Sequence, residues 1–186
     1  MNKLILAASA TALGLTAIPC LAQGWYLGAG IGRGNLNVSG TDLGLPNAQV
    51  GDSATTYTAR LGFRLNPYLA FELGYYDHGE YDFSGELGGI NVAGTAKAKS
   101  VGLSVVGIIP LDTLDLYARI GYANSELKAN ASAAGFVGND KDHQRGMTYG
   151  VGTRWNVNRN WGIFAEWMKN DEIKVDSYLA GVEIRF

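Results

Sequence analysis

Two histidines, each directly preceded by an aspartate, are the residues of this chain best suited to acid–base chemistry. His78 follows Asp77, and His143 follows Asp142. A lipid hydrolase or acyltransferase would need such a histidine together with a serine and a carboxylate. No spacing selects one of the serines that could lie within reach, which are Ser84, Ser100 and Ser125. We therefore interpret both histidines as solvated loop residues, and we predict no catalytic residue and no enzyme activity.

Acidic side chains near these histidines could also hold a metal ion. They are Asp77, Asp82, Asp140 and Asp142. Such groupings arise more often by chance in acidic loops than as metal sites. The glycine-rich run 28–34 is not a phosphate-binding loop, because no helix follows it and no Lys-Ser or Lys-Thr pair is present. We expect neither a metal nor a cofactor.

Charged residues within the predicted strands indicate a different chemistry, that of buried ion pairs. Successive side chains of a strand point to opposite faces, and in most of these strands arginine and glutamate keep to one parity. Isolated charges in an interior would be costly, whereas arginine and glutamate in near balance can satisfy one another. We predict an interior cluster of ion pairs, with glycines of the same parity making room for the long side chains. Its members are Arg60, Glu72, Arg119, Arg154 and Glu166.

Eight strands must position these residues. Alternating side chains predict strands at 25–36, 55–65, 68–78, 98–109, 114–126, 146–157, 161–170 and 176–186. Their lengths fit the roughly 9–11 tilted residues that a strand needs to cross a bilayer.

The connections between these strands alternate in length. Tight turns rich in Asn, Pro and Asp occupy 66–67, 110–113 and 158–160, whereas polar loops occupy 37–54, 79–97 and 127–145. The fourth connection on the long-loop side, 171–175, is shorter. Short turns on one rim and long loops on the other are typical of outer-membrane barrels, whose long loops face outward.

Alternation alone does not say which parity faces inward. A soluble, lipocalin-like barrel would place the uncharged parity inside, whereas a membrane barrel would turn it toward lipid. Aromatic residues near the strand ends favour the membrane barrel, because their rings prefer the interface. They are Trp25, Tyr57, Tyr68, Tyr122, Trp155, Trp161, Trp167, Tyr178 and Phe186. The segment 98–109 is apolar on both parities apart from Ser104, so its faces stay unassigned.

The N-terminal segment predicts export. Residues 1–22 have a positive start, a short apolar run and small residues before a cleavage point after Ala22, as in a signal peptide. An acylated lipoprotein cysteine at Cys20 is the alternative, but Pro19 departs from that motif. We expect one barrel domain at 23–186. It would contain no cysteine, and closed strand pairing in a bilayer would hold it in place of disulfides.

Four segments resemble the transmembrane domain of the OmpA family. They are 24–29 (GWYLGA), 66–75 (NPYLAFELGY), 114–121 (LDLYARIG) and the last strand, 180–186 (AGVEIRF). The resemblance implies an all-β, eight-stranded antiparallel up-and-down transmembrane barrel with an interior salt-bridge cluster. Glu72 and Arg119 fall at matching places, while Arg60 and Glu166 fit by parity only. The periplasmic domain of longer relatives is not expected here.

These observations predict a structural outer-membrane barrel of a Gram-negative cell that displays surface loops. A narrow channel gated by the cluster and a loop-mediated adhesin are the alternatives. We expect Tyr178 and the terminal Phe186 to be the signal read by the barrel assembly machinery. Expected partners are outer-membrane lipid and lipopolysaccharide, and the barrel is expected to be a monomer. The formal net charge of −2 gives no attraction to nucleic acid.

Overall fold

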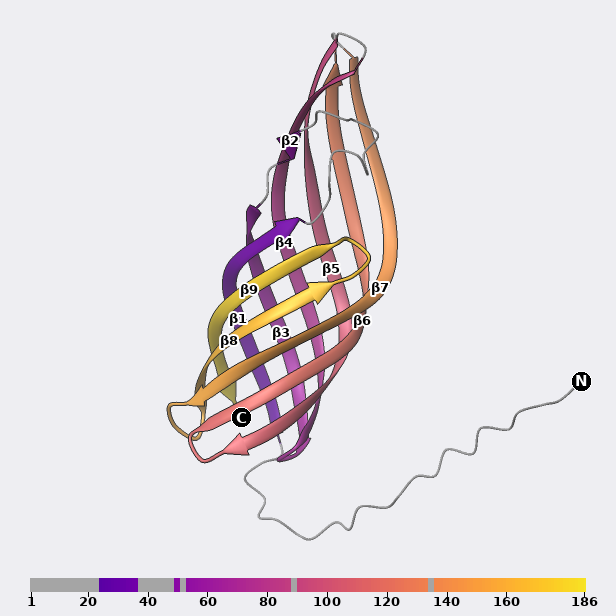
Figure 1. Ribbon diagram of the computed structural model, residues 1–186. Coiled ribbons are helices and arrows are strands. Elements are labelled where there is room, and N and C mark those ends of the chain that lie inside the picture. Colours follow the sequence, from indigo (N-terminus) through magenta and orange to yellow (C-terminus); the bar gives the residue numbers. More distant parts are fainter. Residues whose placement is uncertain (1–23, 37–48, 51–52, 88–89, 134–135) are drawn as a thin grey trace, which may run out of the picture.

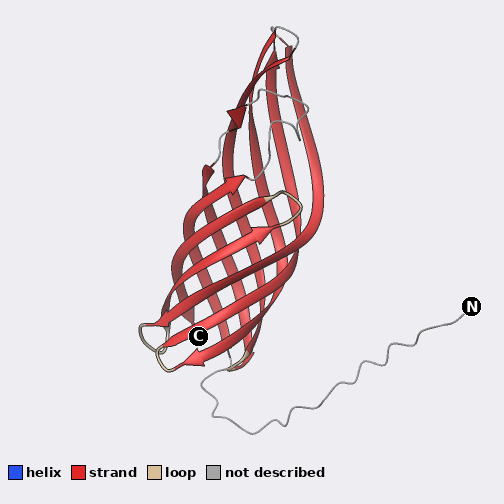
Figure 2. Ribbon diagram, viewed as in Figure 1, coloured by secondary structure: helices blue, strands red, loops and turns tan. Residues whose placement is uncertain are grey.

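The structure, a computed structural model, is a closed antiparallel β-barrel (Figures 1 and 2). It describes residues 24–36, 49–50, 53–87, 90–133 and 136–186. The predicted signal peptide, residues 1–22, and most of the predicted loop 37–54 lie outside these ranges. The strands are β1 (Gly24–Leu36), β2 (Gln49–Val50), β3 (Ser53–Asn66), β4 (Leu69–Leu87), β5 (Ile90–Leu111), β6 (Leu114–Ala133), β7 (Phe136–Asn156), β8 (Trp161–Asn170) and β9 (Val175–Arg185).

Eight of these strands form the barrel wall, and each pairs with its neighbours along the chain. The first and last strands, β1 and β9, pair over the full length of β9, and this pairing closes the wall. The short β2 instead pairs with the upper part of β4. The predicted all-β, eight-stranded antiparallel fold is therefore confirmed.

The burial pattern shows which parity faces the lumen. Along β3, buried residues alternate with exposed ones from Ala54 to Gly62, and β8 repeats the pattern. The charged side chains at mid-strand are buried, whereas Leu61, Phe71 and Ile120 are exposed. Charges face inward and apolar side chains face outward, the arrangement of a barrel surrounded by lipid.

The structure also assigns the faces of β5, which the sequence left open. Ser100, Gly102, Ser104, Val106 and Ile108 are buried, and the residues that alternate with them face outward. Val106 and Ile108 pack in the lumen against Tyr26, Ala70 and Tyr117. This strand is apolar on both faces because part of the lumen is itself an apolar core.

The prediction of long loops was wrong for two of the three segments. Residues 79–97 and 127–145 mostly continue the strands β4 to β7, which have 19, 22, 20 and 21 residues, whereas β8 has 10. These four strands extend well past the ends of β8 and β9 (Figure 1). Cross-strand ion pairs join them, as between Glu80 and Lys97 at 2.9 Å and between Asp77 and Lys99 at 3.2 Å. The residues that the sequence predicted as loops thus mostly form paired strands.

A β-bulge explains why the alternation of β4 is interrupted at the predicted strand end. The register with β5 shifts between Asp77 and Glu80, and Gly79 has a φ of +82°. A Cβ at Gly79 would lie 2.5 Å from the carbonyl oxygen of Thr55. Glycine is required here, because other residues rarely adopt this φ. The bulge reverses the parity, so that Tyr81 faces inward after it.

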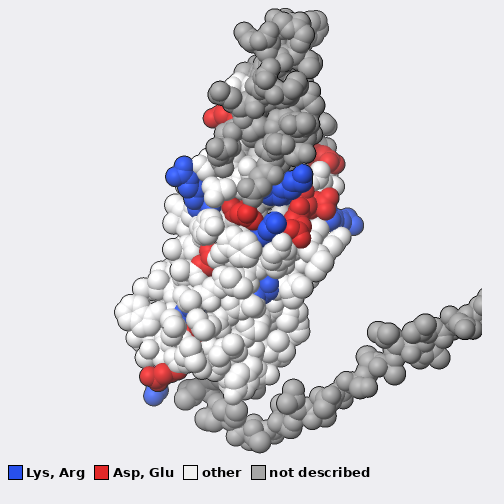
Figure 3. Space-filling model, in the orientation of Figure 1, with Lys and Arg blue, Asp and Glu red and all other residues white. Residues whose placement is uncertain are grey.

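An uncharged outer surface surrounds the barrel below the extended strands. In Figure 3 most of this band is white, and charged residues gather above it and at the lower rim. The predicted interfacial aromatics lie on this surface: Trp25, Tyr68, Trp155 and Trp161 are exposed near the short turns, and Tyr57, Tyr122 and Tyr178 toward the other end. Among the described residues, no helix is long and apolar enough to cross a bilayer.

Candidate functional site: two clusters of ion pairs in the lumen

Four charged side chains meet at the middle of the lumen and form what we call the central cluster, Arg60, Glu72, Arg119 and Glu166. Arg119 lies 2.8 Å from Glu72 and 3.1 Å from Glu166. Arg60 lies 3.0 Å from Glu166 and 4.0 Å from Glu72. Their side chains are at most 1% exposed. Each carboxylate thus faces two guanidinium groups, and two positive charges balance two negative ones.

Three tyrosines add hydrogen bonds to this cluster. The hydroxyl of Tyr26 donates to Glu72 at 2.8 Å, and that of Tyr117 donates to Glu166 at 2.7 Å. Arg119 donates to the hydroxyl of Tyr76 at 2.7 Å. Charge-assisted bonds of this kind are stronger than bonds between neutral groups. The tyrosine rings also fill the space that the charged groups leave.

The fifth predicted member, Arg154, does not join the other four. It belongs to a second group nearer the short turns, the basal cluster, Arg64, Asp115, Arg154, Glu183 and Arg185. Arg154 lies 2.7 Å from Glu183 and 3.6 Å from Asp115. Arg64 pairs with Asp115 at 3.1 Å, and Arg185 with Glu183 at 3.1 Å. Three arginines here share two carboxylates.

The sequence prediction missed Asp115 and the tyrosines, although a signal for them was present. Asp115 and Tyr117 have the same parity as Arg119 in β6, and all three are buried. Extending the inward parity to the ends of each strand would have found Asp115. The hydroxyl contacts of the tyrosines depend on how neighbouring strands are staggered, which alternation does not reveal.

Inward glycines lie beside the largest luminal side chains. A Cβ at Gly28 would be 2.7 Å from Arg60, and one at Gly152 would be 2.7 Å from the ring of Tyr117. At Gly62 it would overlap the ring of Tyr26. These glycines make the room that the ion pairs and tyrosines occupy, which agrees with the sequence prediction.

Toward the long-strand end, the lumen carries neutral polar groups in place of ion pairs. His78 was predicted as a solvated loop residue and is instead fully buried in β4, because the strand continues past it. Its Nε2 lies 3.0 Å from the hydroxyl of Ser100, which lies 2.8 Å from that of Ser125. Asn170 donates to Ser125 at 3.2 Å. His143 is exposed as predicted, but on β7.

The His78–Ser100 contact does not make a hydrolytic site. Asp77, the carboxylate next to His78 in the chain, lies at the other face and pairs with Lys99. Ser100 is 1% exposed, so no substrate could reach its hydroxyl. A nucleophilic serine needs an oriented base and access to substrate. Within the described residues, no group of three or more His, Cys, Asp or Glu side chains could hold a metal ion.

Beyond the bilayer, the charged pairs of the extended strands are exposed to water. Lys97 donates a hydrogen bond to Glu80 and lowers the pKa of that carboxyl. Both side chains are close to half exposed, and pairs of this kind contribute little to stability. The ion pairs that are shielded from water therefore lie in the lumen.

An eight-stranded barrel with an apolar outer surface and a charged, filled lumen is a transmembrane β-barrel. A model of the outer membrane protein beta-barrel domain family matches residues 5–186. The chain belongs to this family, as a non-enzymatic, OmpA-like barrel of the Gram-negative outer membrane.

Relatives and solved structures agree with this assignment. Outer membrane protein A of Klebsiella aerogenes is 27% identical over 180 residues, which cover 88% of this chain and 48% of that protein. The chain thus spans about half the length of this relative. OprG of Pseudomonas aeruginosa has a TM-score of 0.65 at 10% identity, with 88% of this chain and 96% of OprG covered. Ail of Yersinia pestis, in complex with the heparin analogue sucrose octasulfate, has a TM-score of 0.56 at 18% identity, with 88% and 99% covered.

Proposed function

We propose that this protein is a structural outer-membrane barrel, closed to ions by its interior ion pairs, that displays the extended part of β4 to β7 at the cell surface. The observation that carries the proposal is the pair of stacked clusters in the lumen. The arginines and glutamates of the central cluster are at most 1% exposed, and Arg154 of the basal cluster is equally buried.

Two clusters block the lumen at different heights, so re-pairing of one residue would not open it, as it would in a channel gated by a single ion pair. If Glu72 lost its charge, Arg119 would still lie 3.1 Å from Glu166, and the basal cluster would still fill the next section of the lumen. The apolar group Tyr76, Phe164, Met168 and Leu179 is a further barrier to ions. Disturbing one residue therefore does not open a continuous polar path.

Single-channel recording in planar bilayers tests this proposal. We expect no steady conductance from the wild-type protein, from Glu72→Ala or from Arg119→Ala. Glu80→Ala is the matched control, since it removes a glutamate from the exposed extension. A steady wild-type conductance that changes in Glu72→Ala or Arg119→Ala, but not in Glu80→Ala, would show a narrow channel instead.

The display part of the proposal rests on the four tall strands. Ail, which shares the fold, has been crystallised with a heparin analogue. In this chain three lysines of the extension lie beside carboxylates, Lys97 at Glu80, Lys99 at Asp77 and Lys128 at Glu126. A polyanion would have to displace these carboxylates, so the extension favours neutral or mixed-charge contacts over a sulfated polysaccharide.

The remaining partners follow from the place of the barrel in the membrane. Lipid contacts the apolar outer surface, and lipopolysaccharide is the lipid we propose around the outward half. The barrel assembly machinery is proposed as the folding partner, with Phe186 and Tyr178 as its recognition residues. Both side chains are exposed on the outside of the wall. We propose a monomer, because the eight wall strands close on themselves at the level of the membrane, where β1 pairs with β9.

A further inference from the structure

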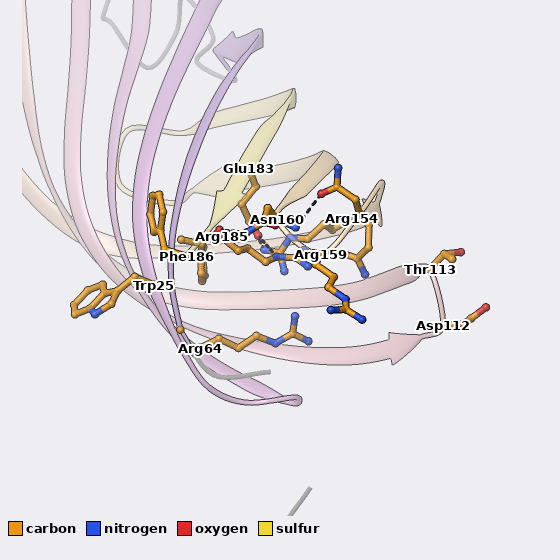
Figure 4. Close-up of a pocket in the computed structure, with 14 residues that line it drawn as sticks. Trp25, Arg64, Asp112, Thr113, Arg154, Arg159, Asn160, Glu183, Arg185 and Phe186 are labelled. Atoms are coloured by element: carbon orange, nitrogen blue, oxygen red, sulfur yellow. Dashed lines mark hydrogen bonds and ion pairs between the residues drawn. The ribbon is translucent and has the colours of Figure 1, made fainter. Parts of the chain in front are cut away.

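The mouth of the barrel at the short-turn end contains a cavity of about 530 Å³. Four arginines from separate segments line it: Arg64 of β3, Arg154 of β7, Arg159 of the turn 157–160 and Arg185 of β9. Figure 4 shows Arg64, Arg159 and Arg185 reaching into the same space. We call this cavity the arginine vestibule. Short turns lie on the periplasmic side of outer-membrane barrels, so the vestibule opens toward the periplasm.

Among the side chains that line this vestibule, positive charge exceeds negative charge, because four arginines face two carboxylates, those of Asp112 and Glu183. Asp115 and Glu183 are shared by three arginines, Arg64, Arg154 and Arg185. Within the described residues, Arg159 has no ion-pair or hydrogen-bond partner, and it is exposed. The other acidic lining residue, Asp112, lies across the mouth with its carboxyl directed away from the arginines (Figure 4).

The arginines are graded in accessibility from the floor of the vestibule to its rim. The side chain of Arg154 is 1% exposed, that of Arg64 13% and that of Arg185 21%, while Arg159 is open to solvent. The buried ion pairs of Arg154 hold the floor in place. Arg64 donates to Asp115 and to the carbonyl oxygen of Pro67, and Arg185 donates to Glu183 and Asn156, so each keeps only part of its donors for a ligand, whereas Arg159 is open to solvent. A planar guanidinium matches the oxygens of a phosphate with two parallel hydrogen bonds.

Aromatic rings place this charge at the depth of lipid headgroups. Trp25 and Phe186 border the same cavity and are 55% and 67% exposed on the outer wall. Aromatic side chains of this kind sit at the interface between hydrocarbon and water. The vestibule therefore lies at the level where phospholipid phosphates lie, and it is also open to soluble phosphates.

We propose that the arginine vestibule binds a phosphate group, with Arg159 and Arg64 as the residues that contact it. The phosphate belongs either to a phospholipid headgroup of the adjacent leaflet or to a free phosphate in the periplasm. The interaction is the same for both sources, a phosphate held between guanidinium groups above a floor of fixed ion pairs.

The first experiment titrates inorganic phosphate into protein folded in a maltoside detergent and follows the arginine side-chain NMR signals. We expect the signals of Arg159 and Arg64 to shift saturably. Arg159→Gln should weaken phosphate binding by about tenfold or more, because a charge-assisted contact is lost. The phosphate affinity of Arg159→Lys should fall between those of the wild type and Arg159→Gln, since lysine keeps the charge and loses the two parallel hydrogen bonds of a guanidinium.

Arg145→Gln is the matched control, because Arg145 is an exposed arginine midway along β7, away from the turn 157–160. Its phosphate affinity should equal that of the wild type. Heat-modifiable gel migration verifies that each variant is folded, which is expected because Arg159 lies on an exposed turn. Absence of a phosphate response in the wild type, or an equal loss in Arg145→Gln and Arg159→Gln, would overturn the proposal.

A second arm distinguishes the two sources of phosphate. A short-chain phosphatidylglycerol is titrated into the detergent sample, and inorganic phosphate is titrated into protein in phospholipid nanodiscs. If the headgroup is the ligand, the lipid shifts Arg159 in detergent and free phosphate has no effect in nanodiscs. If free phosphate is the ligand, its effect persists in nanodiscs. A vestibule that responds to neither compound is not a phosphate site.

Discussion

Each carboxylate of the central cluster accepts contacts from two arginines and one tyrosine, so removing one charge affects several neighbours. A complete buried ion pair is often no more stabilising than apolar residues of the same volume. Half of a pair is strongly destabilising, because the remaining charge has lost its solvent and its partner. Glu166 shows this dependence most clearly, since Arg60, Arg119 and Tyr117 all contact its Oε2.

We predict that Glu166→Gln destabilises the folded barrel by about 3 kcal/mol, at the lower end of what breaking a buried pair costs. Two arginines would then share the single carboxylate of Glu72. The measurement is reversible urea unfolding in lipid vesicles, followed by tryptophan fluorescence. Glu80→Gln, at an exposed pair, should unfold like the wild type. Equal stability of both variants would mean that the luminal charges are solvated.

At the scale of elements, the seam between β1 and β9 is built on close contact between backbones. Gly30 and Gly181 lie opposite each other across this seam. A Cβ at Gly181 would clash with the carbonyl oxygen of Ala29 and lie 2.5 Å from the ring of Phe164. Neither can yield freely, because one belongs to the strand ladder and the other is buried against Arg60 at 4.0 Å.

We predict that Gly181→Ala destabilises the barrel by about 1–3 kcal/mol, as overpacking does in other cores. Gly107→Ala is the matched control, since its nearest neighbour would be the carbonyl oxygen of Ala118 at 4.0 Å. The same urea titration compares the two variants. If Gly107→Ala were the more damaging, the seam would not be the tight part of the wall.

The sequence predicted the strands correctly wherever apolar and polar side chains alternate visibly. Within the membrane, all eight strands were found, because lipid outside and charge inside leave a period of two. The outer halves of β4 to β7 were missed, because their sequences are rich in Gly, Asn, Ala and Asp and resemble loops. The bulge at Gly79 added a change of parity that ended the predicted strand early. Arg154 was predicted in one cluster with the other four residues, but its interior partners are Glu183 and Asp115, because parity gives the face and not the height.

At the scale of the whole molecule, the surrounding bilayer determines which face of the described strands turns outward. The apolar outer surface and the charged lumen reverse the arrangement of a soluble barrel. Leu103 and Ser104 are adjacent in β5, yet Leu103 is 67% exposed and Ser104 is 9% exposed. Leu103 belongs to a large set of exposed apolar side chains on the outer wall, and such a continuous apolar surface is stable in a bilayer.

We predict that a spin label at Leu103 is strongly quenched by a lipid-soluble relaxing agent and that one at Ser104 is not. Both labels are introduced as cysteines with Cys20 replaced by Ser, since Cys20 is the only cysteine of the chain. Electron paramagnetic resonance in vesicles gives the two accessibilities. Quenching at Ser104 without quenching at Leu103 would mean that the barrel is turned inside out.

The unequal heights of the strands give the molecule a sloping outer rim. A membrane neighbour that approaches past β8 and β9 meets a hairpin closed by the four residues 171–174, low against the bilayer. One that approaches past β5 and β6 meets a wall of paired backbone far above it. Neighbouring molecules are therefore excluded unevenly around this protein. Another surface molecule can approach most closely on the side formed by β8 and β9.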